Sequence, residues 1–166
     1  MKTIRVCAAT IAALTVCTTT ALAALWEVNM TGLEEVPPNA SPGTGYGLFD
    51  VNMVTGDFTY SMTANGLTST IIAAHIHNAP VGINGPVIFN LLPGGVWTNP
   101  VVGAGTLSPT HLAELVAGNL YVNVHTQTFP GGEIRGQMRL VPEPGSLAAV
   151  GVGLAGLVAA RKRRRA

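Results

Sequence analysis

Residues 71–92 read IIAAHIHNAPVGINGPVIFNLL. Two apolar runs flank a loop rich in proline, glycine and asparagine, which predicts two strands joined by that loop. Side chains alternate between the two faces of a strand, so His75 and His77 point to one face while Ile76 points to the other. Two imidazoles on one face beside a loop are more typical of a site than of a core.

The same alternation of apolar strands and turns continues on both sides of residues 71–92. Expected strands cover 24–30, 45–51, 57–62, a segment beginning at 71, 87–92, 101–106, 119–126 and 133–141. Between them, 107–118 predicts one short helix near 108–117, with Ser108 as N-cap, Pro109 at the first helical position and an apolar face of Leu112, Leu115 and Val116. The pattern predicts an all-β, antiparallel Greek-key β-sandwich of immunoglobulin-like type.

The first 23 residues have the features of a signal peptide. Lys2 and Arg5 precede an apolar run, and the sequence ALA at 21–23 has the small-x-small form of a cleavage site. We therefore expect an N-terminal signal helix removed by signal peptidase. Lipoprotein processing at Cys17 is the alternative, and the bulky residue before that cysteine disfavours it.

The other end of the chain combines a short motif, an apolar run and a basic cluster. Residues 147–160 are apolar throughout, whereas a spanning helix usually needs about 20 residues. A buried helix or a low-complexity tail would explain such a run. A basic cluster that follows at once favours instead a hydrophobic helix retained at the cytoplasmic face; the cluster is Arg161, Lys162, Arg163, Arg164 and Arg165.

The residues Pro142, Glu143 and Pro144, followed by this apolar run and arginine-rich end, closely resemble the PEP-CTERM sorting signal. The resemblance implies that these three residues form a recognition motif. It also implies that an exosortase-type enzyme of exopolysaccharide-producing Gram-negative bacteria cleaves the tail. Residues 142–166 would then anchor the precursor transiently in the inner membrane.

The domain between these ends, residues 24–141, is acidic and lacks cysteine. Both cysteines, Cys7 and Cys17, lie in the leader, so the domain has neither a disulfide nor a thiolate ligand. The domain contains two arginines and seven carboxylates, which gives it a net charge of −5. A nucleic-acid partner is excluded, because phosphate binding needs clustered lysine and arginine.

Three segments resemble the CHRD domain: HIHNAPVGINGPVIFNL (75–91), LSPTHLAELVAGN (107–119) and LYVNVHTQTFPGGEIRGQM (120–138). The resemblance covers most of 45–140. Members of that family are found in animal secreted antagonists and in exported bacterial proteins. The resemblance thus implies a fold and an extracytoplasmic location rather than a reaction.

A weaker resemblance connects the His-x-His strand, the late histidine and the Gly-Gly-x-x-Arg segment with Cu/Zn superoxide dismutase. It implies that His75, His77 and His125 are metal ligands and that Arg135 guides anions. Neutral imidazoles suit copper or zinc, and three of them leave one coordination position open. However, 78–99 contains no further His or Asp, and no cysteine holds that loop. A partial mononuclear site remains one reading; a hydrogen-bonded structural cluster of histidines is the other.

Other polar and aromatic residues receive simpler interpretations. Glu133 and Arg135 share one face of the last strand, which predicts an ion-pair network or a contact of Arg135 with a loop carbonyl; an anion clamp is the functional alternative. Trp97 is the candidate aromatic for a carbohydrate platform, and Trp26 is expected in the core. His111 is expected to face solvent from the helix.

Together these patterns predict a non-enzymatic binding or structural module of the cell envelope or extracellular matrix. Its expected partners are signal peptidase, an exosortase-type enzyme, and exopolysaccharide or an envelope protein. The alternative function is a copper or zinc metalloprotein with a dismutase-like histidine site and redox activity.

Overall fold

The computed structural model describes residues 23–142. The expected signal helix, the C-terminal hydrophobic helix with its basic cluster, and Glu143 and Pro144 of the sorting motif lie outside the described residues. The strands are β1 (Ala23–Thr31), β2 (Thr44–Asn52), β3 (Asp57–Asn65), β4 (Ile71–Asn78), β5 (Val87–Asn90), β6 (Val101–Thr106), β7 (Leu120–Thr126), β8 (Ile134–Gln137) and β9 (Arg139–Leu140). One α-helix, α1 (Pro109–Val116), and two 3-10 turns, η1 (Gly32–Glu34) and η2 (Pro93–Gly95), complete the described part.

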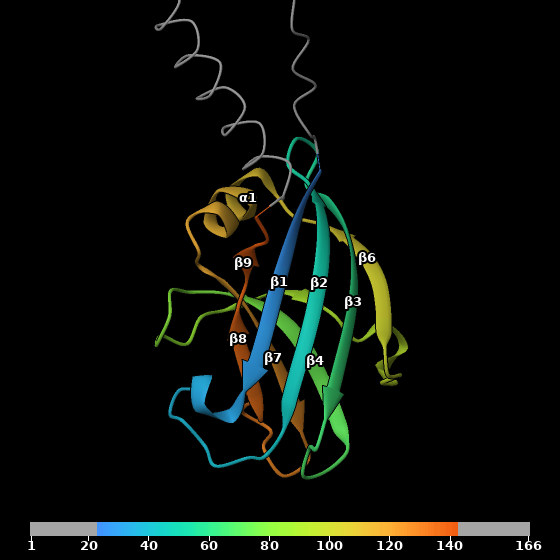
Figure 1. Cartoon of the computed structure of the whole chain (residues 1–166), viewed down its shortest axis with the longest axis vertical. Helices are drawn as coiled ribbons and strands as arrows, with labels where there is room; N and C mark the ends of the chain where they lie inside the picture. The colour runs from blue at the N-terminus through green and yellow to red at the C-terminus, as the bar shows by residue number, and fades with distance from the viewer. Residues whose placement is uncertain (1–22, 143–166) are drawn as a thin grey trace, which may run out of the picture.

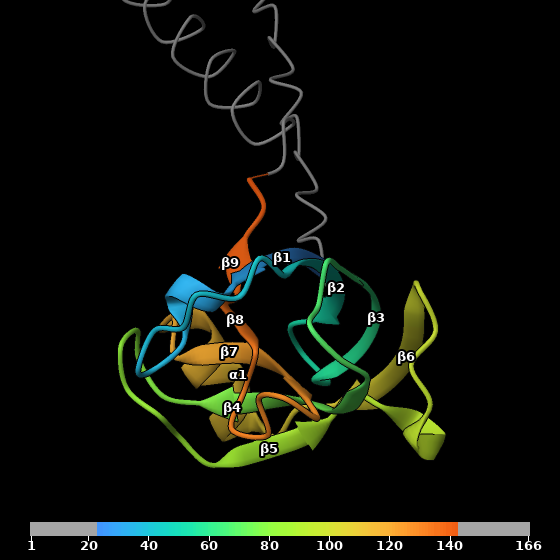
Figure 2. The same ribbon diagram turned by 90° about the horizontal axis from the view of Figure 1, so that it is seen from below.

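All the strands form one antiparallel sheet that curls until it is nearly closed, as Figure 2 shows from below. The strand order is β5-β4-β7-β8-β1-β2-β3-β6, with β9 beside β1. β1, β2 and β3 form one wall, and β4, β7 and β8 form the facing wall (Figure 1). The predicted all-β antiparallel sandwich with one short helix is confirmed, and non-sequential neighbours such as β4 and β7 separate it from a simple meander.

The two edge strands meet through side chains rather than through a backbone ladder. A Cβ placed on Gly105 of β6 would lie 2.3 Å from the ring of Phe89 on β5, so this glycine makes room for the aromatic ring. Phe89 also packs edge-on against Phe58, with ring centroids 5.0 Å apart. The opening between the edges is thus filled by an aromatic contact.

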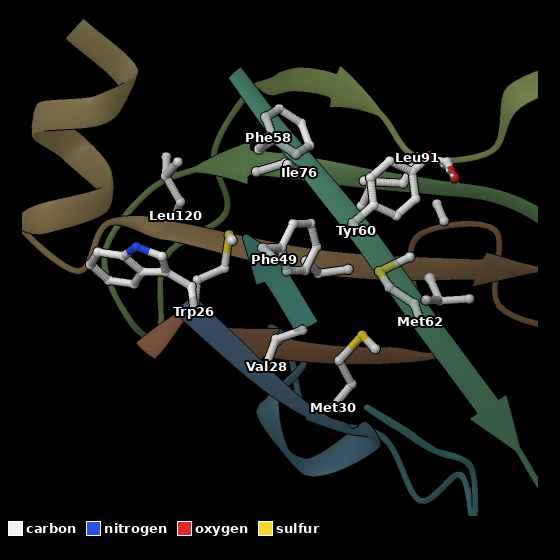
Figure 3. Packing of buried hydrophobic residues seen from close by; sticks show 14 of the residues in the cluster. Trp26, Val28, Met30, Phe49, Phe58, Tyr60, Met62, Ile76, Leu91 and Leu120 are labelled. Carbon is white, nitrogen blue, oxygen red and sulfur yellow. Dashed lines mark hydrogen bonds between the residues drawn. The ribbon is translucent and has the colours of Figure 1, made fainter. Parts of the chain in front are cut away.

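Alternation along the strands places the core between the walls (Figure 3). Trp26, Val28 and Met30 of β1 are all buried, as are Phe58, Tyr60 and Met62 of β3. The predicted core position of Trp26 is confirmed. Period-2 patterning of this kind is what drives a sheet to bury one face.

Two elements differ from expectation in detail. The predicted strand 133–141 is divided at Met138, which is 2% exposed and donates its backbone N–H to the Leu120 carbonyl, 2.9 Å away. In α1 the Ser108 cap is confirmed, since its hydroxyl accepts from the His111 N–H at 3.2 Å. Val116, by contrast, is 65% exposed because the core lies on the Leu115 side and the helix ends there.

Strand β7 is buried on both faces, not on one. The seven residues Leu120–Thr126 are all buried. Loops cover the outer face: Asn39 donates to the Gly132 and Glu133 carbonyls, and Asn84 donates to the Val36 carbonyl at 2.8 Å. The outer face of β4, β7 and β8 therefore forms a second, polar interior, and this layer contains the histidines.

Within the described residues, no helix has the length and apolarity needed to cross a membrane.

Candidate metal centre

The three predicted histidines converge on the outer face of β4 and β7. His75 and His77 lie on β4, and His125 lies on the neighbouring strand β7. One ligand nitrogen from each ring lies within 4.8 Å of the other two. His75 Nδ1 and His125 Nε2 are 3.2 Å apart. Antiparallel pairing of β4 with β7 thus brings together residues 50 positions apart.

His77 is the most constrained of the three. Its Nδ1 lies 3.0 Å from the Gly85 carbonyl oxygen, which can only accept, so Nδ1 carries the hydrogen and Nε2 keeps the lone pair. The ring stacks on Tyr121 with centroids 4.9 Å apart and planes inclined by 10°. Its Nε2 is buried and has no hydrogen-bond partner among residues 23–142.

His125 is fixed in the same tautomer by a different loop. Its Nδ1 lies 3.0 Å from the Pro130 carbonyl oxygen, leaving Nε2 unprotonated. This Nε2 accepts a hydrogen bond from His75 Nδ1–H. His77 and His125 therefore each present a lone pair on Nε2, and His75 donates its Nδ1 hydrogen to that of His125.

These distances are close to those of a coordinated metal ion. Two imidazole nitrogens bound tetrahedrally at about 2.0 Å are about 3.3 Å apart. The His75–His125 pair already has this spacing, and the remaining closure is at most about 1.5 Å. A metal ion that replaced the shared hydrogen would need this closure and a tautomer change at His75, the least buried of the three rings.

Burial favours the neutral form of all three rings. Burial lowers the pKa of His75, and the charges of His125 and His77 lower it further. Burial likewise lowers the pKa of His77 and of His125, against the opposing effect of their backbone hydrogen bonds. The nearby Arg135 cation also lowers the pKa of His77. Neutral imidazole is the form that binds metal.

The predicted partners Glu133 and Arg135 are held by different groups. Arg135, 2% exposed, donates to the Ile83 carbonyl at 2.9 Å, to Asn84 Oδ1 at 3.1 Å and to the Pro80 carbonyl at 3.4 Å. This agrees with the loop-carbonyl interpretation. Its guanidinium carbon lies 3.5 Å from the centre of the Tyr121 ring.

Glu133 is buried and accepts hydrogen bonds from three residues. Ser41 and Thr126 donate through their hydroxyls, and Thr68 donates through both its hydroxyl and its backbone N–H. Burial alone would raise the pKa of Glu133, but these bonds hold it below its usual range. The carboxylate therefore connects the loops that close this end of the polar layer.

Glu35, Tyr121 and Asn123 also belong to the polar layer, and the sequence did not predict them as site residues. Glu35 is 5% exposed, receives a hydrogen bond from Asn123 Nδ2 at 3.3 Å, and leaves Oε1 without a partner. Burial raises its pKa to about 7, with the attraction of Arg135 opposing the shift. Alternation places Tyr121 and Asn123 on the same face of β7 as His125, whereas Glu35 lies in a turn with no periodic signal.

The remaining candidates lie outside this layer. His111 is half-buried on α1 rather than solvent-facing. Trp97 is half-buried, packs against the core, and lines an open cavity of about 500 Å³ with residues 64–67 and 69–71.

Comparison with known proteins agrees with the sequence motifs. Residues 140–165 match the PEP-CTERM protein-sorting motif, which marks a chain for export and for processing by an exosortase-type enzyme. Chordin of Danio rerio is 28% identical over 104 residues, which is 62% of this chain and 11% of chordin. No solved structure matches the chain significantly. The model of the CHRD domain matches residues 26–138, from the first wall of the sheet through the polar layer with its three histidines, and the chain therefore belongs to the CHRD domain family.

Proposed function

We propose that this exported CHRD domain binds a single copper or zinc ion through His75, His77 and His125. The observation that carries the proposal is the convergence of three ligand nitrogens within 4.8 Å, two of them on rings whose tautomer is fixed by backbone carbonyls. His75 would bind through Nδ1, and the other two through Nε2. The open fourth position would take water or an exogenous ligand.

The buried Nε2 of His77 favours metal binding over a purely structural cluster. A structural cluster would pair each buried nitrogen, since an unpaired buried polar atom costs about 1–3 kcal/mol. His77 Nε2 has no such partner. A metal ion beside Nε2 would supply such a partner, and metal binding would then be the function of this unpaired nitrogen.

The ligand set determines the class of metal. Three neutral imidazoles with neither carboxylate nor thiolate disfavour magnesium and calcium, which prefer oxygen ligands. Among divalent ions of the first transition row, affinity for such a site is greatest for Cu²⁺ and lower for Zn²⁺. We therefore expect Cu²⁺ to bind more tightly than Zn²⁺.

In this proposal the domain is a binding module rather than an enzyme. Export followed by exosortase-type processing would place it in the cell envelope or extracellular matrix, where it would hold metal outside the cytoplasm. Residues 1–23 would act as the signal peptide and 142–166 as the temporary anchor.

The test is a metal titration of the full chain, purified without a polyhistidine tag. Cu²⁺ and Zn²⁺ are titrated against chromophoric chelators, and metal content is measured by mass spectrometry. We expect one ion per chain, and an affinity reduced more than about 100-fold by His75→Ala or His77→Ala. Loss of a group that only hydrogen-bonds to a metal ligand already costs about 10–100-fold, and loss of the ligand itself should cost more.

His111→Ala is the matched control, since His111 lies on α1 and is the one histidine of four outside the cluster. It should bind like the wild type. Circular dichroism of each variant separates loss of ligand from loss of fold. Absence of stoichiometric binding, or an equal loss in His111→Ala, would contradict the proposal.

A further inference from the structure

We infer that Arg135 is the positioning residue of this centre, acting on His77 through residues 79–86. The metal-binding purpose of Arg135 rests on the proposed metal site, whereas the contacts that Arg135 makes do not depend on that proposal. Arg135 lies on β8, and strand β7 separates it from the β4 strand that carries His77. The two residues are connected by two separate routes.

The first route is a circuit of hydrogen bonds through the loop. Arg135 donates to Pro80, Ile83 and Asn84. The next residue, Gly85, accepts from His77 Nδ1 at 3.0 Å through its carbonyl. A guanidinium that bonds three successive parts of a loop fixes where the following carbonyl lies, because its donors have a rigid planar arrangement.

The second route passes through Tyr121. The Tyr121 ring lies between Arg135, from the β8 side, and His77, from the β4 side. Its hydroxyl accepts from the Gly85 N–H at 3.0 Å. Tyr121 therefore fixes the position of Gly85, and Gly85 in turn fixes the tautomer of His77.

Both routes have the same consequence for the metal ligand. With its Nδ1–H held by Gly85, His77 can offer only Nε2. Without Arg135 the loop carbonyl loses its fixed position, and the imidazole samples both tautomers. His125 provides an internal reference, because its Nδ1 is held by Pro130 in a different loop.

The experiment compares the full chain carrying Arg135→Gln, Arg135→Lys or Asn84→Ala with the wild type. Nitrogen-15 chemical shifts of the metal-free protein report the tautomer of each histidine, and Cu²⁺ titration reports affinity. We expect Arg135→Gln to give mixed tautomers at His77 alone and about 10–100-fold weaker Cu²⁺ binding. Arg135→Lys, which keeps a charge but loses the fork, should recover part of both.

Asn84→Ala covers the case in which a change at buried Arg135 prevents folding. Asn84 is exposed, so its truncation leaves the core intact. It removes one of the contacts of Arg135 with the loop, together with the hydrogen bond from Asn84 to the Val36 carbonyl. Its expected effect is a smaller shift in the same direction. Unchanged His77 tautomers in the folded variants, or an equal change at His125, would overturn the inference.

The two proposals fail separately. Wild-type protein that binds no Cu²⁺ contradicts the metal centre but leaves the tautomer result to decide the role of Arg135. Tight wild-type binding with unaltered His77 tautomers in Arg135→Gln contradicts only the positioning role.

Discussion

At the scale of single residues, the outer face of β4, β7 and β8 contains polar groups that burial has made chemically unusual. Each histidine of the cluster has a lowered pKa, and Glu35 has a raised one. The shifts have one common cause, the loops that exclude water from this face. A half-exposed sheet with the same sequence pattern would leave the same residues near their ordinary pKa values.

Glu35 gives this layer a measurable pH dependence. Its pKa is about 7 in the folded chain against 4.5 as the ordinary value, so between these values the folded state keeps a proton that the unfolded state releases. The free energy of unfolding therefore falls as pH rises from about 4.5 to about 7, by up to about 3 kcal/mol. In Glu35→Gln this contribution should be absent.

Urea denaturation at several pH values checks this prediction. The difference between wild type and Glu35→Gln isolates Glu35, because the histidines titrate in both. The exposed neighbour provides the control, and Glu34→Gln should follow the wild-type curve. Parallel curves for wild type and Glu35→Gln would show that Glu35 does not hold its proton.

At the scale of elements, the connection between β4 and β5 does more than join two strands. It supplies the carbonyls that hold Arg135 and the carbonyl that holds His77. Its backbone also lies very close to β4: a Cβ on Gly85 would be 2.0 Å from the Asn78 carbonyl oxygen. Only glycine fits at this position without a steric clash.

Gly85→Ala should therefore open this connection. We expect a loss of about 1–3 kcal/mol in the free energy of unfolding, as for other overpacked sites, together with weaker Cu²⁺ binding because the His77 contact is displaced. Gly131→Ala is the matched control, since nothing lies within 4 Å of the added Cβ. Thermal melts and the metal titration measure both effects; equal behaviour of the two variants would contradict the steric argument.

At the scale of the whole molecule, the two ends of the described chain are neighbours. Trp26 of β1 pairs with Leu140 of β9, and the Val141 N–H donates to the Leu25 carbonyl at 2.8 Å. The loop after β7, which holds His125 through Pro130, lies at the opposite end of the sheet (Figure 1). The junctions to the leader and to the sorting segment are therefore at one end, and the His125 side of the cluster is at the other.

Replacing Pro142, Glu143 and Pro144 together by alanine should abolish processing without changing the domain. The sheet ends at Leu140 and Pro142 is exposed, so we expect the domain to keep its fold in this variant. We expect unprocessed chain to accumulate in the membrane fraction, as seen by immunoblot after cell fractionation. Scrambling residues 147–149 controls for general damage to the tail, and normal release of the alanine variant would contradict the role of the motif.

The sequence determined the strands, the helix cap, the family and the sorting signal, because each depends on local periodicity or on a contiguous motif. Alternation alone placed His75 and His77 on one face, and the same rule assigned Tyr121, Asn123 and His125 to one face of β7. Only the tertiary structure decided that β4 and β7 are neighbours in a register that brings His75 Nδ1 to 3.2 Å from His125 Nε2. The tertiary structure also determines that loops bury the outer face of β4, β7 and β8 and that Glu35 lies in this layer. It likewise determines that Arg135 hydrogen-bonds to the loop of residues 79–86. These contacts join residues far apart in the chain, and their formation depends on how the whole sheet closes rather than on any local pattern.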